Sequence, residues 1–407
     1  MTYSRRLFLA LFLGAAFSPI FASAGDASLD GDFFTIAVIP DTQNYVDDTK
    51  PQPDSFATFK AETRYLASEG RALKLAFVTH VGDVVQHGDG TSSPGAASYS
   101  AGLEWTRAQQ AMGILEETGV PFGMSIGNHD YDNSGYTVGY QPLTSNVMWR
   151  RYFGSRSALF EGKPWYGGAS DQLAHDPGLS SYQTFIAAGR YFLHISLEME
   201  ASDDALAWAQ QVIDSHPGYA TIITTHEYIN APEQGDDRPP LRAPAERVAA
   251  TPRYRRGSPA GWNDAQGVWD KLIAKNAQVF MVLCGHAWRP AVNGVSKSEN
   301  IRIDNDVAGH PVYQILTDYQ GNTLASSGGD GWLRLMTFDL RDHAIHFSTY
   351  SPALNKYAGR GGERTFGQAP EFSAFVLPIP VQVLGARRVS LSGTEHSKDS
   401  ARRKVVR

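Results

Sequence analysis

Residues 121–130 read Pro-Phe-Gly-Met-Ser-Ile-Gly-Asn-His-Asp, and the last part of this stretch organises the whole chain. The apolar run that ends at Ile126 is typical of a buried strand, and the glycine after it marks the end of that strand. The next three residues are Asn128, His129 and Asp130, which place an amide, an imidazole and a carboxylate in consecutive positions. Packing needs no such set, so the stretch indicates chemistry at the end of a strand.

Single polar residues follow four other apolar runs in the same way. They are Asp41 after residues 34–40, Asp83 after 75–82, His226 after 221–225 and His286 after 279–285. In layered α/β folds the carboxyl ends of neighbouring parallel strands converge on one crevice. The sequence therefore predicts that two aspartates, one asparagine and two histidines form a single cluster.

The order of apolar patterns predicts an α/β protein. Residues 33–39 and 73–78 read as strands with helical spacing over 58–71 between them, which is typical of parallel pairing. Further helices are expected at 104–118, after Ser202 and at 269–275, and further strands at 121–126, 191–197, 221–225 and 277–284. The last strands, at 312–316, 332–340 and 344–350, have no helices between them, which predicts a second, antiparallel sheet.

The first 24 residues read as an export signal. Arg5 and Arg6 precede an apolar run over 7–21, and Ala-Ser-Ala then offers a small-residue cleavage site. The paired arginines match the twin-arginine type, which exports folded proteins across a bacterial membrane, and an ordinary secretory signal is the alternative. The apolar run is too short for a comfortable span, so we expect no membrane span after signal removal and a periplasmic or secreted protein.

The remaining chain is predicted to be one domain over 25–384, followed by a basic tail over 385–407. The tail lacks an apolar pattern and is expected to be disordered. Loop insertions are expected near 132–181 and 229–262, at the rim of the crevice, where their aromatic and arginine side chains would line the opening. Three arginines of the second insertion either hold an anionic group or belong to a solvated loop: Arg253, Arg255 and Arg256.

Charge and cysteine content exclude other classes of protein. The 407 residues carry a net charge of −6, but the tail contributes +5 and the leader +2, which leaves −13 for the rest. An acidic body gives no reason to expect nucleic acid as a partner. Cys284 is the only cysteine, so neither an intrachain disulfide nor a thiolate metal cage exists, and its apolar setting favours a buried thiol.

Carboxylate, amide and imidazole groups together suit a divalent ion such as Mn, Fe or Zn. A shared carboxylate holds two ions about 4 Å apart, where they acidify a water molecule and neutralise the oxygens that enter and leave at phosphorus. The leaving oxygen also needs a proton donor, and His129, beside Asp130, fits that part without binding metal. The residues alone favour metal-dependent hydrolysis of a phosphoester.

The order of these motifs resembles that of the calcineurin-like metallophosphoesterase family, whose members carry D-x-H, G-D, G-N-H-D/E, a lone histidine and G-H-x-H. The corresponding blocks here extend over about residues 33 to 350. The resemblance implies a two-sheet α/β/β/α sandwich that holds two divalent ions, Mn, Fe or Zn. It also implies hydrolysis of a small phosphomonoester or phosphodiester by a metal-activated hydroxide. The sequence does not indicate the oligomeric state.

The resemblance also implies a role for each residue. Asp83 resembles the carboxylate that bridges the ions. Asn128, His226 and His286 resemble the other ligands of one ion, and Asp41 resembles a ligand of the other. His129 resembles the proton donor and Asp130 the residue that fixes its imidazole.

Two positions depart from the family pattern. Gln43 stands in place of the histidine of D-x-H, and Trp288 in place of the last histidine of G-H-x-H. An amide oxygen is a weaker ligand, and an indole cannot bind a divalent ion. We therefore expect a weakly bound first ion and a firm second ion. His80, His87 and His310 are candidates to complete the first site, and each of them is otherwise structural.

Two rival functions remain open at this point. Gly-Met-Ser-Ile-Gly over 123–127 matches the G-x-S-x-G elbow of serine hydrolases, with Ser125 as nucleophile. That motif requires a turn at the serine, whereas the apolar run here continues to Ile126. The second rival is a metal- or ligand-binding protein of the same fold, with an impaired first metal site and little turnover.

Overall fold

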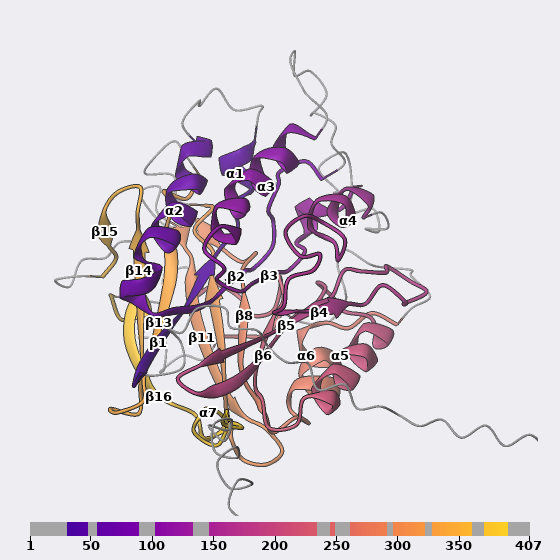
Figure 1. Ribbon diagram of the computed structural model, residues 1–407, viewed down its shortest axis with the longest axis vertical. Helices are drawn as coiled ribbons and strands as arrows, with labels where there is room; N and C mark the ends of the chain where they lie inside the picture. The colour runs from indigo at the N-terminus through magenta and orange to yellow at the C-terminus, as the bar shows by residue number, and fades with distance from the viewer. Residues whose placement is uncertain are drawn as a thin grey trace, which may run out of the picture.

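The computed structural model describes residues 31–47, 55–88, 102–132, 146–233, 245–248, 261–290, 296–321, 328–359 and 370–389. Within these ranges two mixed β-sheets pack face to face, and helices cover the outer face of each sheet (Figure 1). The predicted α/β/β/α sandwich is therefore confirmed.

The first sheet contains the three parallel strands that the sequence predicts. β1 (Phe33–Ile39), β2 (Leu75–His80) and β3 (Phe122–Met124) lie side by side, and helix α2 (Ser55–Leu73) connects β1 to β2. Beyond β1 the sheet continues in antiparallel order with β13 (Leu333–Asp339) and β14 (Ala344–Ser351), and β14 pairs with β15 (Lys356–Tyr357) and β16 (Ala374–Pro378).

The second sheet has the order β11, β12, β8, β7, β6, β5, β4. Its parallel centre consists of β6 (Arg190–Ser196), β7 (Ala220–Thr224), β8 (Val279–Cys284) and β12 (Pro311–Thr317). The antiparallel edges are β4 (Tyr166–Ala169), β5 (Ser181–Ala187) and β11 (Glu299–Asn305). Two short strands, β9 (Arg289–Pro290) and β10 (Ser296–Lys297), pair with each other.

The expectation that the late strands form their own antiparallel sheet is wrong. β13 and β14 join the first sheet beside β1, whereas β12 pairs in parallel with β8. A parallel neighbour requires a long crossover, and a helical pattern usually marks it. Here the chain between β8 and β12 contains β11, which forms an antiparallel hairpin with β12. The described residues of this connection form no helix, so the sequence has no helical pattern that would indicate parallel pairing.

Helices cover both outer faces. α2 and α3 (Leu103–Glu116) pack on the first sheet, and α5 (Asp203–Ser215), α6 (Ala265–Val268) and the π-turn η3 (Trp269–Ile273) pack on the second. The expected cap at Ser202 is confirmed, because its hydroxyl accepts the N–H of Ala205 at 3.1 Å. The other short helices are α1 (Gln43–Val46), α4 (Val147–Phe153), α7 (Val381–Leu384), η1 (Asn128–Asp130) and η6 (Pro370–Phe372).

The described helices include no membrane span. Each of them is either too short or too polar to cross a bilayer.

Part of the segment expected as a loop insertion at 132–181 belongs to the core. Residues 133–145 lie outside the described ranges, but α4 and β4 follow them. Phe160 and Trp165 are buried against Phe122 of β3, with ring centroids 5.3 and 5.2 Å from it. These aromatic residues have neither helical nor alternating spacing, so the sequence pattern did not reveal their burial.

Other predicted segments fall largely outside the described residues. They include the export signal, most of the insertion at 229–262 with its three arginines, and the tail beyond residue 389. The first residues of the tail are described. There the backbone N–H of Arg387 donates to the Gly218 carbonyl at 2.7 Å, and that of Val389 donates to the Gly189 carbonyl at 3.0 Å.

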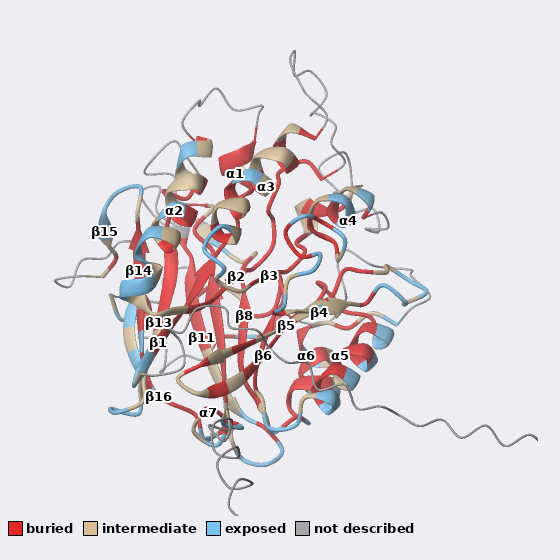
Figure 2. Ribbon diagram, viewed as in Figure 1, coloured by how far each residue is buried: buried red, intermediate tan, exposed pale blue. Residues whose placement is uncertain are grey.

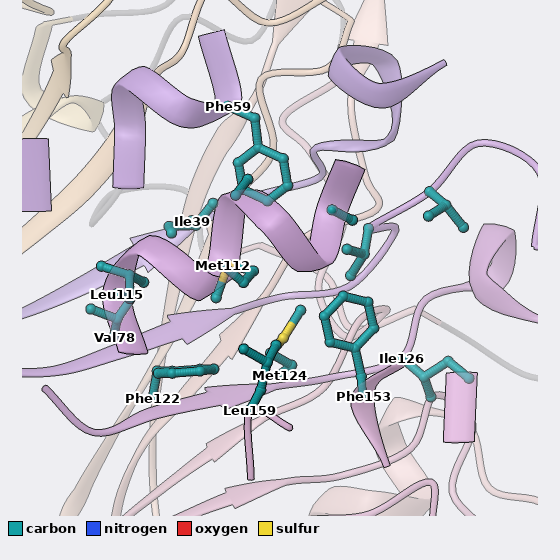
Figure 3. Close-up of a cluster of buried hydrophobic side chains, with 14 of the residues drawn as sticks. Ile39, Phe59, Val78, Met112, Leu115, Phe122, Met124, Ile126, Phe153 and Leu159 are labelled. Atoms are coloured by element: carbon teal, nitrogen blue, oxygen red, sulfur yellow. The ribbon is translucent and has the colours of Figure 1, made fainter. Parts of the chain in front are cut away.

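Alternation along β1 shows how the strands build two cores. Ile36 and Val38 face the second sheet, while Ala37 and Ile39 face the helices. Figure 3 shows Ile39 and Phe59 in the helix-side cluster, and Figure 2 shows the central strands mostly in the colour of buried residues. Because both faces of these strands are covered, a polar cluster fits best where the strands end.

A buried histidine in the second sheet predicts how stability depends on pH. His194 of β6 lies between the Gln183 side chain and the Thr224 hydroxyl, each at 2.8 Å, and burial lowers the pKa of His194 to about 3. An unfolded histidine titrates near 6.5. Between pH 6.5 and 3 the unfolded chain therefore binds a proton that the folded chain does not. This group should lower the free energy of unfolding by about 1.4 kcal/mol per pH unit in that window, and it leaves stability intact above pH 6.5.

Urea denaturation at pH 7, 6 and 5 checks this prediction. His194→Gln should reduce the loss of stability on acidification relative to the unaltered chain, and His346→Gln, at an exposed position of β14, should not. Equal pH slopes for His194→Gln and the unaltered chain would contradict it.

Candidate metal centre

The structure brings together the five strand ends that the sequence singled out. Asp41 and Asp83 follow β1 and β2, and Asn128 begins η1 just beyond β3. From the second sheet, His226 follows β7 and His286 follows β8. The centre therefore lies where the carboxyl ends of parallel strands from both sheets meet.

Four of the polar groups surround one point beside His226. Its Nε2 atom lies 3.2 Å from Asp83 Oδ1, 3.2 Å from Asn128 Oδ1 and 3.1 Å from His286 Nδ1. Ligands held about 2.1 Å from a common ion are about 3.0 to 3.4 Å apart in octahedral or tetrahedral geometry. The spacing of these atoms is thus that of a ligand set for a divalent ion.

The groups behind both imidazoles engage the ring nitrogen that faces away from this point. His226 Nδ1 donates to the Val81 carbonyl at 3.0 Å, so Nε2 is the nitrogen that would bind an ion. His286 Nε2 lies 3.5 Å from Glu227 Oε1, which leaves Nδ1 toward the centre. A carboxylate or carbonyl behind a histidine is the usual support of a metal ligand. Sequence reasoning missed Glu227, although it directly follows His226.

Asp83 lies between this set and a second group of oxygen atoms. Its Oδ1 faces His226, whereas its Oδ2 accepts from Gln43 Nε2 at 3.2 Å. Asp41 lies on the Gln43 side, where its Oδ1 accepts the backbone N–H of His286 at 3.1 Å. Two buried atoms here have no hydrogen-bond partner, Asp41 Oδ2 and Gln43 Oε1. Buried polar atoms normally have a partner, so these two fit an ion.

The electrostatics of the centre indicate that it needs positive charge. Burial, together with the neighbouring Asp318, raises the pKa of Asp41. Burial alone would lower the pKa of His226, but Asp83 and Asp41 outweigh it and raise that pKa to about 10. Within the described chain, the ion pairs of Asp41 and Asp83 involve His226 rather than a lysine or arginine. A divalent ion would supply the missing charge.

His129 lies at the centre in a fixed orientation. Its backbone N–H donates to Asp83 Oδ1 at 2.9 Å, and its Nδ1 lies 3.1 Å from the Gln86 carbonyl. The expected contact with Asp130 takes a different form, because Asp130 accepts backbone N–H groups instead: Val84 and Val85 at 2.8 and 3.0 Å and Gly127 at 2.9 Å. Asp130 therefore fixes the loop after β2, and the Gln86 carbonyl is the group beside the imidazole.

A family model described as calcineurin-like phosphoesterase matches residues 34–290, which is more than half of the chain. The chain belongs to this family. The family is typically dependent on two metal ions, which agrees with the ligand groups found here.

Two proteins illustrate what this chain is similar to. The uncharacterized protein YvnB of Bacillus subtilis (strain 168) is 27% identical over 346 residues, which are 84% of this chain and 22% of YvnB. The chain thus spans about a fifth of the length of that relative. A solved structure described as GAP50, the anchor in the inner membrane complex of Plasmodium, has a TM-score of 0.37 and 12% identity over 80% of this chain and 86% of its own.

None of the three histidines considered for the first site, His80, His87 and His310, is placed to complete it. Trp288 is 40% exposed, and its indole offers no ligand atom to a divalent ion. His80 is buried with Nε2 at 3.0 Å from the Thr42 hydroxyl and Nδ1 at 3.1 Å from the Gly82 N–H, so both of its nitrogens are engaged. His87 lies 2.8 Å from Glu104, and His310 lies near Asp306 at the opposite end of β12.

A second group of possible ligands consists of Asp47, His87 and Glu104. Its geometry favours a structural role. Glu104 Oε2 accepts the backbone N–H groups of Gln86 and His87 at 2.8 and 2.9 Å, and Oε1 lies 2.8 Å from His87 Nδ1. Both carboxylate oxygens are therefore satisfied without an ion.

The backbone of the centre is strained at three ligand positions. Asp41, Asp83 and His286 have φ angles of 25°, 51° and 68°, in a region that side chains rarely adopt. Such residues cost about 1–3 kcal/mol each and cluster at functional sites. The neighbouring glycines allow close approach, since a Cβ atom on Gly127 would meet Asp83 Oδ1 at 2.2 Å and the Asp83 backbone nitrogen at 2.3 Å.

Gly127→Ala should therefore displace Asp83 and weaken ion binding. We expect a loss of about 1–3 kcal/mol in stability and a smaller rise in Tm on addition of Mn²⁺. Gly113→Ala is the matched control, because nothing lies within 4 Å of its added methyl group in α3, and helix propensity favours alanine by about 0.5–1 kcal/mol. Thermal denaturation with and without Mn²⁺ measures both effects. A full Mn²⁺ response in Gly127→Ala would show that the close approach is unnecessary.

Proposed function

We propose that this protein is an exported hydrolase of small phosphomonoesters or phosphodiesters that binds divalent ions at the strand-end centre. The observation that carries the proposal is the convergence of Asp83, Asn128 and His286 on His226 Nε2 at 3.1–3.2 Å. Asp83 is suited to bridge two ions, because its oxygens face the imidazole group on one side and Gln43 on the other. Ions bound there acidify water and neutralise charge on phosphoryl oxygens.

His129 is the proposed proton donor to the leaving oxygen. The Gln86 carbonyl orients the ring through its Nδ1, and Nε2 is the nitrogen proposed to donate the proton. The ring is only partly buried, which suits contact with a bound molecule, and the bond from its backbone to Asp83 fixes its distance from the ions. The role of Asp130 is then to position the loops that carry Asp83 and His129.

His129→Ala should lower kcat by about 100-fold on p-nitrophenyl phosphate or bis-p-nitrophenyl phosphate, because a general acid typically contributes 10²- to 10⁴-fold. Ion binding should persist, since the imidazole of His129 is not in the ligand set. His346→Ala, at an exposed position of β14, should leave kcat unchanged. Steady-state assays with and without Mn²⁺, together with Mn²⁺ titration of each variant, measure these effects.

Two results would count against this role. If His129→Ala keeps full activity, another group donates the proton. If the unaltered protein binds an ion tightly but hydrolyses no phosphoester, the metal-binding alternative with little turnover replaces the hydrolase.

Export rests on the sequence of residues 1–24, which lie outside the described residues. We expect this segment, fused to green fluorescent protein, to deliver folded, fluorescent protein to the bacterial periplasm through the twin-arginine route. Changing Arg5 and Arg6 to lysine should abolish periplasmic fluorescence. Fluorescence that persists in the double lysine variant would contradict twin-arginine export. Cell fractionation measures the outcome.

A further inference from the structure

Asp318 lies outside every motif that the sequence singled out, yet it belongs to the same centre. It directly follows β12, which runs parallel to β8, whose own end carries His286. Asp318 is fully buried. The neighbouring strand of the same sheet thus delivers one more carboxylate to the edge where the centre lies.

Gln320 connects Asp318 to the first-ion side of the centre. Its Nε2 lies 3.0 Å from Asp318 Oδ2 and 3.4 Å from Asp41 Oδ1. Its Oε1 accepts from Gln43 Nε2, which also contacts Asp83 Oδ2 at 3.2 Å. Five side chains thereby form one continuous group whose potential metal ligands are all oxygen atoms.

This group lacks the partners that buried charge requires. Asp41, Asp83 and Asp318 are at most 2% exposed, and in the described part of the chain no lysine or arginine forms an ion pair with them. Two oxygen atoms, Asp41 Oδ2 and Gln43 Oε1, are buried without a hydrogen-bond partner. Buried carboxylates are normally paired or bound to a metal ion, so the group is suited to a cation.

We infer that Asp318 and Gln320 complete the first-ion site in place of the two missing histidines, together with Asp41, Gln43 and Asp83. An all-oxygen site of this kind selects a hard divalent ion, Mg²⁺ or Mn²⁺. The imidazole side, with His226 and His286, takes a borderline ion such as Zn²⁺. The centre is therefore chemically asymmetric, with different ions preferred on its two sides.

The amides of Gln43 and Gln320 can serve such an ion once each amide flips. Rotation about the last side-chain bond exchanges the oxygen and the nitrogen of an amide at nearly the same positions. In Gln43 this brings the unpartnered Oε1 to the place where Nε2 now faces Asp83 and Gln320.

The inference rests on the proposed metal centre. A two-step titration tests the first-ion site and the proposed centre separately. Metal-free full-length protein receives one equivalent of Zn²⁺, which imidazole ligands favour, and is then titrated with Mn²⁺ by calorimetry. Elemental analysis by mass spectrometry gives the stoichiometry. The unaltered protein should bind one Zn²⁺ and then one Mn²⁺. Asp318→Asn and Gln320→Leu should each bind Zn²⁺ normally and weaken Mn²⁺ binding at least 10-fold.

Asp306→Asn is the matched control, because Asp306 is a buried carboxylate at the opposite end of β12 and should not affect either ion. Normal Zn²⁺ uptake by each variant also shows that it is folded at the centre. Unchanged Mn²⁺ affinity in Asp318→Asn, or no Mn²⁺ uptake by the Zn²⁺-loaded unaltered protein, would overturn the inference and leave the proposed function standing. Failure of the unaltered protein to bind Zn²⁺ would overturn the proposed centre itself.

Discussion

Negative charge buried at the junction of two sheets is the constraint on which the rest of the structure depends. Three aspartates, Asp41, Asp83 and Asp318, are almost inaccessible to water. Within the described ranges His226 is the basic side chain that forms ion pairs with Asp41 and Asp83. Taking carboxylates out of water costs several kcal/mol each unless a cation or several donors compensate. The fold is therefore most readily understood as one that places carboxylates where a divalent ion will neutralise them.

The backbone around the centre follows from the same constraint. Ligands can surround an ion only if their chains approach more closely than side chains normally permit, and glycines precede Asp83, Asn128 and His286 for this reason. The positive φ angles at Asp41, Asp83 and His286 belong to the same arrangement, because each strand must turn sharply to direct its next side chain inward. The two hydrophobic cores hold these strand ends in place and so maintain the strain.

Much of this could be predicted from the sequence, because strand ends converge in layered folds. Apolar runs located β1, β2, β7 and β8 and the polar residue after each. The pattern could not show which sheet the late strands join, since pairing across the molecule leaves no local trace. The pattern also could not show that Asp130 accepts hydrogen bonds from backbone N–H groups and not from the His129 imidazole. Asp318 follows an apolar run in the same way as the others, but the antiparallel hairpin of β11 and β12 conceals that β12 runs parallel to β8 and ends at the same edge.

Crystals grown with Zn²⁺ and measured near the zinc absorption edge show whether an ion binds beside His226. We expect an anomalous peak at about 2.0–2.2 Å from Asp83, Asn128, His226 and His286. A peak between Asp47, His87 and Glu104 instead, or no peak beside His226 at saturating Zn²⁺, would contradict the metal centre.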